Sequence, residues 1–307
     1  MLNYLKLVRF PNLCMIALTQ WVIKLMLINV FFKHTTLSFL DFTLLVLATV
    51  CIAAAGYIIN DIHDVAIDQI NKPDKQLIGK KIKLTHAYNT FFLLNIIGVA
   101  LGFYIAFEIE RSGFAVIFVL VSGLLYLYAT MLKPIPLIGN LTVCISVAIS
   151  ILLPFFFDVV PVQDISNRWM TVYVLEISLC YAGFAFFISF IRELVKSIED
   201  IDGDYNNGIR SVPMLIGKKR TSRVTALMAL SMVLILFYII YQYLYHYTIL
   251  NAYILFGIMG PLFYFTFTSW EAKKKKHFTR LSQLLKVIML AGVISLVVFR
   301  YTVLNDL

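Results

Sequence analysis

Residues 42–68 read FTLLVLATVCIAAAGYIINDIHDVAID, an apolar run that is followed at once by three aspartates, Asp61, Asp64 and Asp68. An apolar run of about 20 residues has the length that crosses the hydrocarbon layer of a membrane as a helix. Carboxylates beside hydrocarbon are costly, so those found at a membrane segment indicate a functional site. This stretch therefore predicts both a membrane fold and the place where its chemistry occurs.

The composition of the whole chain agrees with a membrane fold. Of the 307 residues, 61% are hydrophobic and 14% are charged, and the mean hydropathy is +0.86. A soluble domain carries about a quarter charged residues, so we expect an all-α polytopic membrane protein with a single domain, residues 1–307. The apolar runs are too long and too uniform for the strands of a membrane barrel. Nine runs can span, near residues 11–32, 41–60, 88–107, 113–131, 137–157, 171–191, 224–245, 249–270 and 283–304.

The basic residues predict the orientation. If the N-terminus is cytoplasmic, the cytoplasmic segments hold 21 of the 26 Lys and Arg residues, as expected because short cytoplasmic loops retain Lys and Arg. Both acidic segments then face the cytoplasmic side of the cytoplasmic membrane. The net charge of +9 suits loops that face anionic lipid, so a nucleic-acid partner is not expected.

The acidic segment occurs twice. DIHDVAIDQIN at residues 61–71 aligns with SIEDIDGDYNN at residues 197–207, so that Asp64 and Asp68 correspond to Asp200 and Asp204. LIGKK at residues 77–81 recurs at residues 215–219. An internal repeat of this kind predicts two related halves. We place them roughly at residues 1–136 and 137–307, around a central chamber.

The spacing of the acids predicts a metal site. On a helix, residues three, four and seven apart lie on one face, which groups Asp61, Asp64 and Asp68 in one stripe and Asp200 and Asp204 in another. Mg²⁺ takes oxygen ligands and is commonly held by one or two carboxylates and the phosphates of a substrate. Two acidic stripes with lysine-rich flanks therefore predict two metal ions that clamp a diphosphate. The alternative is that both stripes are solvated helix ends.

Basic residues in the two loops that follow the acidic stripes are candidates to contact the diphosphate. Pro73 and Gly79 interrupt helix formation in the first loop. The candidate cations are Lys72, Lys75 and Arg210. The lysines of the two LIGKK copies are interpreted as determinants of topology.

Four motifs together resemble a known family. NDIHDVAIDQINKPDK at residues 60–75 resembles the N-D-x-x-D-x-x-x-D signature of the UbiA-type intramembrane prenyltransferases, and RELVKSIEDIDGD at residues 192–204 resembles their second acidic motif. LKLVRFPN at residues 5–12 and YATMLKPIPLIGN at residues 128–140 are similar to their first and central segments. The resemblance covers nearly the whole chain. The second acidic motif is most similar to that of the geranylgeranylglyceryl-phosphate geranylgeranyltransferases.

The resemblance implies a reaction. This is the Mg²⁺-dependent transfer of a prenyl group from an isoprenyl diphosphate to a membrane-resident or amphiphilic acceptor, with geranylgeranylglyceryl phosphate as the best match. It also implies that Asn60 joins the five aspartates in binding metal and diphosphate, and that Lys133 contacts the diphosphate. Lys196 is a further candidate for the diphosphate. The residues assigned to the acceptor or the chamber are Arg9, Asn12, Tyr128, Asn140 and Arg192.

One departure and several alternatives remain. Ser197 stands where related sequences often carry aspartate, so Glu193 or Glu199 is a candidate replacement ligand in the second metal site. An aromatic quinone precursor or a tetrapyrrole is the alternative acceptor. A cation-coupled transporter is the alternative from another class, although the two acidic copies share one orientation and an inverted repeat would separate them. The motif order of the CDP-alcohol phosphotransferases is not found in the sequence.

Overall fold

The computed structural model describes residues 2–66, 69, 76–206 and 210–306. In these ranges the chain is helical and contains no β-strand. Nine helical segments of the described chain are long and apolar enough to cross a membrane, which confirms the number predicted from the sequence. They are Phe10–Phe31, Phe39–His63, Leu84–Glu108, Ser112–Leu132, Ile138–Val162, Ile165–Glu199, Lys218–Leu244, Thr248–Glu271 and Lys275–Thr302.

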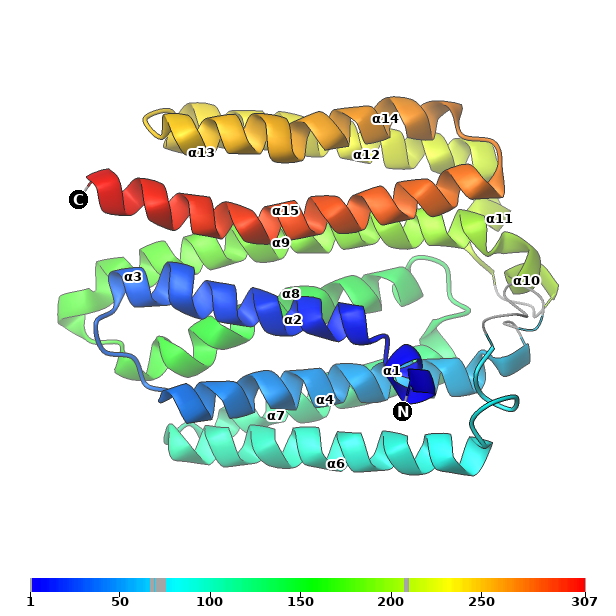
Figure 1. Cartoon of the computed structure of the whole chain (residues 1–307), viewed down its shortest axis with the longest axis horizontal. Helices are drawn as coiled ribbons and strands as arrows, with labels where there is room; N and C mark the ends of the chain where they lie inside the picture. The colour runs from blue at the N-terminus through cyan, green and yellow to red at the C-terminus, as the bar shows by residue number, and fades with distance from the viewer. Residues whose placement is uncertain (1, 67–68, 70–75, 207–209, 307) are drawn as a thin grey trace.

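Several spans combine an α-helix with a short π-helical or 3₁₀ segment, so the helix labels in Figure 1 outnumber the spans. The labelled helices are α1 (Leu2–Leu7), α2 (Phe10–Ile23), α3 (Asn29–Phe31), α4 (Phe39–His63), α6 (Leu84–Glu108), α7 (Ala115–Leu127), α8 (Ile138–Asp158), α9 (Arg168–Glu199), α10 (Ile201–Asn206), α11 (Val212–Ile216), α12 (Lys218–Ile239), α13 (Thr248–Tyr253), α14 (Gly260–Glu271) and α15 (Lys275–Asp306).

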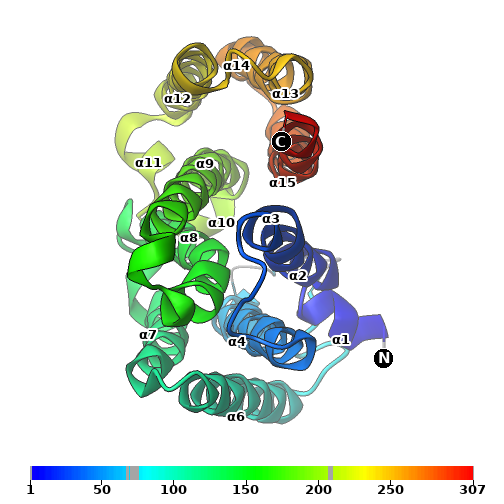
Figure 2. The same cartoon turned by 90° about the vertical axis from the view of Figure 1, so that its left-hand side faces the viewer.

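The long helices run roughly along one common direction (Figure 1). Seen along that direction, α4, α6 and α7 lie at one side of the molecule and α12, α13 and α14 at the other, with α2, α8, α9 and α15 between them (Figure 2). Helix α9 packs against α8, α12 and α15, and α2 packs against α4, α8 and α15. The helices in the middle therefore have neighbours on several sides, and they are the ones that can enclose a site.

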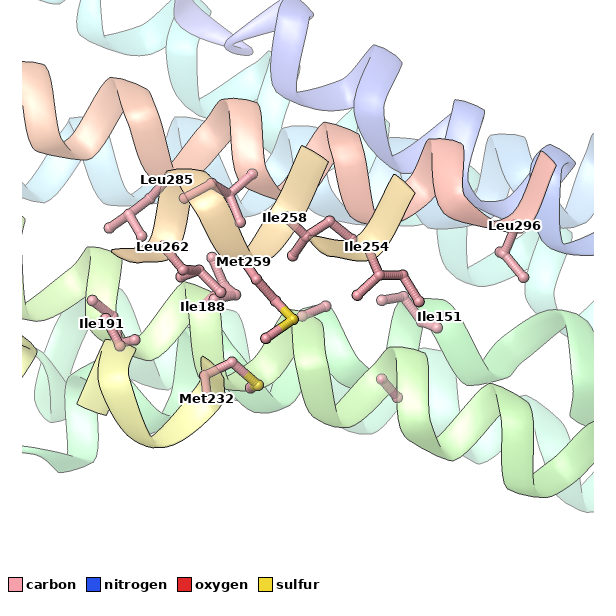
Figure 3. Packing of buried hydrophobic residues seen from close by; sticks show 14 of the residues in the cluster. Ile151, Ile188, Ile191, Met232, Ile254, Ile258, Met259, Leu262, Leu285 and Leu296 are labelled. Carbon is pink, nitrogen blue, oxygen red and sulfur yellow. The ribbon is translucent and has the colours of Figure 1, made fainter. Parts of the chain in front are cut away.

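The buried apolar side chains also form separate clusters toward the two sides of the molecule. A large cluster of buried side chains joins α8, α9, α12, α14 and α15, and a smaller one joins α4, α6 and α7 with the end of α8. Figure 3 shows the large cluster, in which methionines fill the spaces between branched side chains. Its labelled members are Ile151, Ile188, Ile191, Met232, Ile254, Ile258, Met259, Leu262, Leu285 and Leu296.

Helices α4 and α6 approach closely because α6 presents glycine to α4. A Cβ atom on Gly98 would lie 2.7 Å from Cγ1 of Ile52 and 3.0 Å from the backbone oxygen of Ala48. One turn further on, a Cβ atom on Gly102 would lie 2.3 Å from the ring of Phe118. Small residues four apart let helices pack closely in membranes, where lipid supplies no hydrophobic force between them. The G-x-x-x-G pair thus fixes α6 against α4 and α7.

Helix α9 is longer than a membrane requires. Its 32 residues give a length of about 48 Å at 1.5 Å per residue, against about 30 Å for the hydrocarbon layer. The last turns of α9 carry Arg192, Glu193 and Lys196. The apolar run predicts the end of this span at residue 191, but helical hydrogen bonding continues through the charged residues that follow.

A buried ion pair fixes the end of the bundle opposite to the acidic segments. Lys24 lies in a π-helical segment that continues α2, and its ammonium pairs with the carboxylate of Asp158 at the end of α8. The Lys24 side chain is 8% exposed and that of Asp158 is 0% exposed. Asp158 Oδ1 also accepts a hydrogen bond from the backbone N–H of Leu37 at 2.8 Å. The pair thereby joins three segments that are distant in sequence.

Candidate active site

A cavity of about 600 Å³ lies between α2, α4, α7, α8, α9 and α15. Its two ends differ in chemistry. At one end the lining consists of charged and amide side chains from the start of α2, the end of α4, the segment before α8 and the end of α9. Further along the same helices the lining is mainly apolar and includes Ile52, Phe118, Val147 and Leu296. We call this cavity the chamber and its charged end the polar end.

The first acidic segment reaches the polar end through Asn60 and Asp64. Both line the chamber, and Asp64 is 8% exposed. Oδ2 of Asp64 accepts a hydrogen bond from Nδ2 of Asn60 at 2.7 Å, and its Oδ1 forms an ion pair with Lys133. Lys133 follows the π-helical end of the α7 span, so α4 and α7 together position this carboxylate.

Asp61 points to a different partner. Its Oδ1 accepts a hydrogen bond from Nη2 of Arg9 at 2.8 Å, and it is not among the residues that line the chamber. Arg9 does line the chamber, and its guanidinium lies 4.8 Å from the ring centre of Tyr57. Burial lowers the pKa of Arg9, but the charge and hydrogen bond of Asp61 and the nearby Tyr57 and Tyr128 together outweigh burial, so the pKa is raised above its ordinary value. Arg9 is therefore a permanent cation.

The second acidic segment supplies Asp200 and Asp204, which both line the chamber. Asp200 is the residue at which α9 ends, and Asp204 lies in the short helix α10. Ser197 also faces the chamber and donates a hydrogen bond to the backbone oxygen of Glu193 at 3.0 Å. Of the two candidate replacements for the missing aspartate, Glu193 lines the chamber, whereas Glu199 does not and accepts a hydrogen bond from a threonine of α15.

The predicted helical stripes are corrected in one respect. The predicted stripes need one continuous helix under each group of acids, but α4 ends at His63 and α9 ends at Glu199. Asp64 and Asp200 follow directly, with φ angles of −89° and −99°, and helical residues resume after each of them. Carboxylates at a helix C-terminus are disfavoured by the helix dipole, so these positions cost stability, which the Lys133 ammonium offsets at Asp64. Asp68, Lys72 and Lys75 lie outside the described residues.

The two acidic copies share local geometry. Asp64 and Asp200, which correspond in the sequence alignment, both end a long helix. The glycines of the two LIGKK copies, Gly79 and Gly217, have φ angles of 84° and 88°. Only glycine adopts this left-handed conformation without strain. The division into halves at residue 136 stays a prediction.

The other predicted site residues gather at the polar end. The described ones that line the chamber there are Arg9, Asn12, Tyr128, Lys133, Asn140, Arg192, Lys196 and Arg210. Sequence reasoning did not assign Lys286 of α15, which lines the chamber too, and it named Glu193 only as a replacement ligand. Nζ of Lys286 donates a hydrogen bond to Oδ1 of Asn12 at 3.3 Å. A lysine inside an apolar run of α15 was the available signal for this residue.

The donor atoms at the polar end fit a hard divalent cation. Asn60, Asp64, Asp200 and Asp204 all bring oxygen atoms to the chamber. Oδ1 of Asn60 is buried and has no hydrogen-bond partner among the described residues, so an amide oxygen is available as a ligand. Mg²⁺ needs only one or two carboxylates when a substrate supplies phosphate oxygens. Within the described part of the chain, which does not include Asp68, no three carboxylate, imidazole or thiol groups gather around one point.

A chamber of this kind, charged at one end and apolar along its length, is the architecture of a membrane enzyme that acts on amphiphilic anions. The model of the UbiA prenyltransferase family matches residues 25–290. The chain therefore belongs to the UbiA prenyltransferase family, which confirms the resemblance noted in its motifs and makes it an integral membrane prenyltransferase.

Individual proteins agree with this assignment. The digeranylgeranylglyceryl phosphate synthase of Methanobrevibacter smithii is 29% identical over 301 residues, which cover 98% of each chain. A solved structure described as digeranylgeranylglyceryl phosphate synthase is 26% identical, with a TM-score of 0.61 over 96% of this chain and 98% of that one. A UbiA homologue from Archaeoglobus fulgidus, solved with DMAPP and Mg²⁺, shares the fold at 15% identity, with a TM-score of 0.56 over 96% of this chain and 99% of that one.

Proposed function

We propose that this protein transfers a geranylgeranyl group from geranylgeranyl diphosphate to geranylgeranylglyceryl phosphate within the membrane, and that the transfer depends on Mg²⁺. The observation that carries the proposal is the chamber itself, because acids, amides and cations line one end and apolar side chains line the rest. A polyprenyl diphosphate has the same division between a charged head and an apolar tail. The names of the similar synthases supply the best candidate for the acceptor.

The diphosphate is assigned to the polar end. Asn60, Asp64, Asp200 and Asp204 would hold Mg²⁺, as a homologue of the same fold binds DMAPP and Mg²⁺. When bound, the metal ion neutralises negative charge on the departing diphosphate. Asp68 belongs to the same motif, and Asp61 supports it by holding Arg9.

The cations of the polar end complete the diphosphate site. Lys133, Lys196 and Arg210 line the chamber beside the acids, and Lys72 and Lys75 remain candidates from the sequence. Lys133 pairs with Asp64, and when a diphosphate is present its ammonium can interact with phosphate oxygens. Cations aimed at the oxygens that gain charge stabilise the transition state. The prenyl C–O bond then breaks and diphosphate leaves, while the acceptor hydroxyl oxygen forms the new ether bond and its proton passes to the released diphosphate.

The chamber is long enough to hold part of a polyprenyl tail beside the diphosphate site. Asp64 at the polar end and Thr49 both line it on α4 and are fifteen residues apart, which corresponds to about 22 Å along a helix. The apolar residues of this stretch, with those of the neighbouring helices, supply the surface against which a geranylgeranyl tail can pack.

The acceptor assignment is tested by offering the purified protein a panel of acceptors. With radiolabelled geranylgeranyl diphosphate and Mg²⁺, we expect transfer to geranylgeranylglyceryl phosphate, and little or no transfer to 4-hydroxybenzoate or to a hydroxynaphthoate. Omission of Mg²⁺ with added chelator should stop the transfer. Robust labelling of an aromatic acceptor, with none of the glyceryl phosphate, would contradict the assignment and leave the family assignment intact.

The polar end is proposed to face the cytoplasm, since the loops beside it carry most of the basic residues. Ile165 precedes α9 at the opposite end and is 91% exposed, whereas Lys219 at the start of α12 is exposed beside the polar end. In a cysteine-free background, Ile165→Cys should react with an impermeant maleimide in intact cells. Lys219→Cys should react only after permeabilisation. The reverse labelling pattern would place the polar end outside.

A further inference from the structure

Lys286 occupies an unusual position on α15. The helix begins at Lys275, so Lys286 lies eleven residues along it, about 16 Å from its start at 1.5 Å per residue. Its side chain lines the chamber, and its ammonium donates a hydrogen bond to Oδ1 of Asn12 at 3.3 Å. The side chain is exposed and lies near the start of the apolar run at residues 283–304, and an ionisable side chain that faces a chamber between membrane helices is a candidate for a function.

The charges around Lys286 are not balanced. Arg192 and Arg9 repel its ammonium, and Glu193 attracts it. Glu193 is already shared, because its Oε1 lies 3.2 Å from Arg192 and 3.3 Å from Lys196. No carboxylate of the described residues lies within ion-pair distance of Lys286. Positive charge is thus in excess on this side of the chamber.

Arg192 also has unused hydrogen-bonding capacity. Its Nη1 donates to Glu193, but its Nε is buried and has no hydrogen-bond partner among the described residues. A buried donor without a partner costs about 1–3 kcal/mol, and a bound anion would satisfy it. Asn12 is held in place from both sides, because it donates to the Tyr57 hydroxyl at 3.4 Å and accepts from Lys286.

A simpler interpretation is that Lys286 extends along α15 toward the membrane surface, as lysines near helix ends do. Lys276, in the basic run at the start of α15, is exposed and has a position from which a lysine can extend toward the membrane surface. Lys286 instead contacts Asn12, which lines the chamber with it. The contact holds the ammonium at the chamber, which Arg192 of α9 also lines.

We propose that Lys286 and Arg192, supported by Asn12, form a second anion subsite that binds the phosphate group of the acceptor. The inference rests on the proposed function. The subsite draws on α2, α9 and α15, and Lys286 and Asn12 come from helices that supply none of the residues assigned to the metal or the diphosphate. Arg192 lies one turn before Lys196 on α9, so the subsite adjoins the diphosphate site. A further pair of cations beside that site suits a reaction that joins two anionic substrates. Lys286 is then the residue that selects acceptors with a phosphate.

The test compares Lys286→Met with Lys286→Arg and with the control Lys276→Met, which removes the same charge from the same helix outside the chamber. Loss of a hydrogen bond to a charged group corresponds to about a ten- to hundredfold loss of affinity. Lys286→Met should therefore raise the KM for geranylgeranylglyceryl phosphate by about that factor, with the KM for geranylgeranyl diphosphate nearly unchanged. Lys286→Arg should restore most of the acceptor affinity, and Lys276→Met should resemble the parent protein.

A second measurement separates recognition from a structural role. The ratio of kcat/KM for geranylgeranylglyceryl phosphate to that for the uncharged geranylgeranylglycerol should fall about ten- to hundredfold in Lys286→Met. A folding defect would lower both values and leave the ratio unchanged, which would overturn the subsite. An equal rise of both KM values would assign Lys286 to the diphosphate and would also overturn it. If the parent protein transfers to no phosphate-bearing acceptor, the proposed acceptor is wrong and the subsite fails with it.

Discussion

Replacement of Asp64 by asparagine is expected to lower the rate of prenyl transfer by about 10²–10³-fold, the effect of removing one strong electrostatic contact from an active site. The substitution keeps the size of the side chain and removes its charge. Both carboxylate oxygens of Asp64 have partners, one in Asn60 and the other in Lys133. The neutral amide would weaken metal binding and release Lys133 from its ion pair, so positive charge would no longer be held at the position of the diphosphate.

Single-turnover transfer from radiolabelled geranylgeranyl diphosphate, measured across a range of Mg²⁺ concentrations, is the suitable assay. Asp41→Asn is the matched control, because Asp41 lies at the opposite end of the same helix. It should retain the activity of the parent protein. Both variants should elute as folded protein in detergent. Turnover of Asp64→Asn near the parent level at limiting Mg²⁺ would show that this carboxylate does not bind the metal.

The second large effect is expected on stability, at the buried pair of Lys24 and Asp158. Replacement of Asp158 by leucine would leave the Lys24 ammonium buried without its counter-charge, and loss of one partner from a buried pair costs about 3–5 kcal/mol. The ammonium would keep its hydrogen bond to Thr35 at 2.7 Å and its contact with the ring of Phe42 at 5.4 Å. Neither contact supplies a negative charge.

The double variant Lys24→Met with Asp158→Leu should recover most of the lost stability, because it removes both charges at once. Reversible unfolding in mixed micelles gives the free energies of unfolding for the single and double variants. Glu108→Leu is the control, since Glu108 is an exposed carboxylate at the end of α6 and its loss should change stability by less than about 0.5 kcal/mol. Equal stability of Asp158→Leu and the parent protein would mean that the ion pair contributes nothing.

The sequence alone predicted the nine spans, and the physical reason is local. A chain in hydrocarbon must satisfy its backbone hydrogen bonds within each segment, so a long apolar run becomes a helix whatever its neighbours are. The motifs likewise predicted most residues of the polar end, since Asn60, Asp64 and Asp200 lie where apolar runs stop. These residues lie at helix ends because polar and charged residues follow the apolar runs in the sequence and therefore stay outside the hydrocarbon layer.

The tertiary structure decided which charges pair and which face the chamber. Asp61 and Asp64 are three residues apart, yet Asp61 binds Arg9 while Asp64 binds Lys133. Helical spacing predicted that both point the same way. The difference arises because their cations come from separate segments, the N-terminal segment before α2 and the segment after α7, and the packing of these segments around α4 fixes which cation meets which acid.

The same reason explains the contacts between side chains that the sequence did not predict. Lys24 and Asp158 are 134 residues apart, and Lys286 and Asn12 are 274 residues apart. Each lies in or beside an apolar run in which its neighbours in sequence reveal no partner. Sequence determines how far each helix extends and which residues it carries, because helical hydrogen bonds are local. The pairing of charges between helices depends on how the helices pack, and only the tertiary structure decides it.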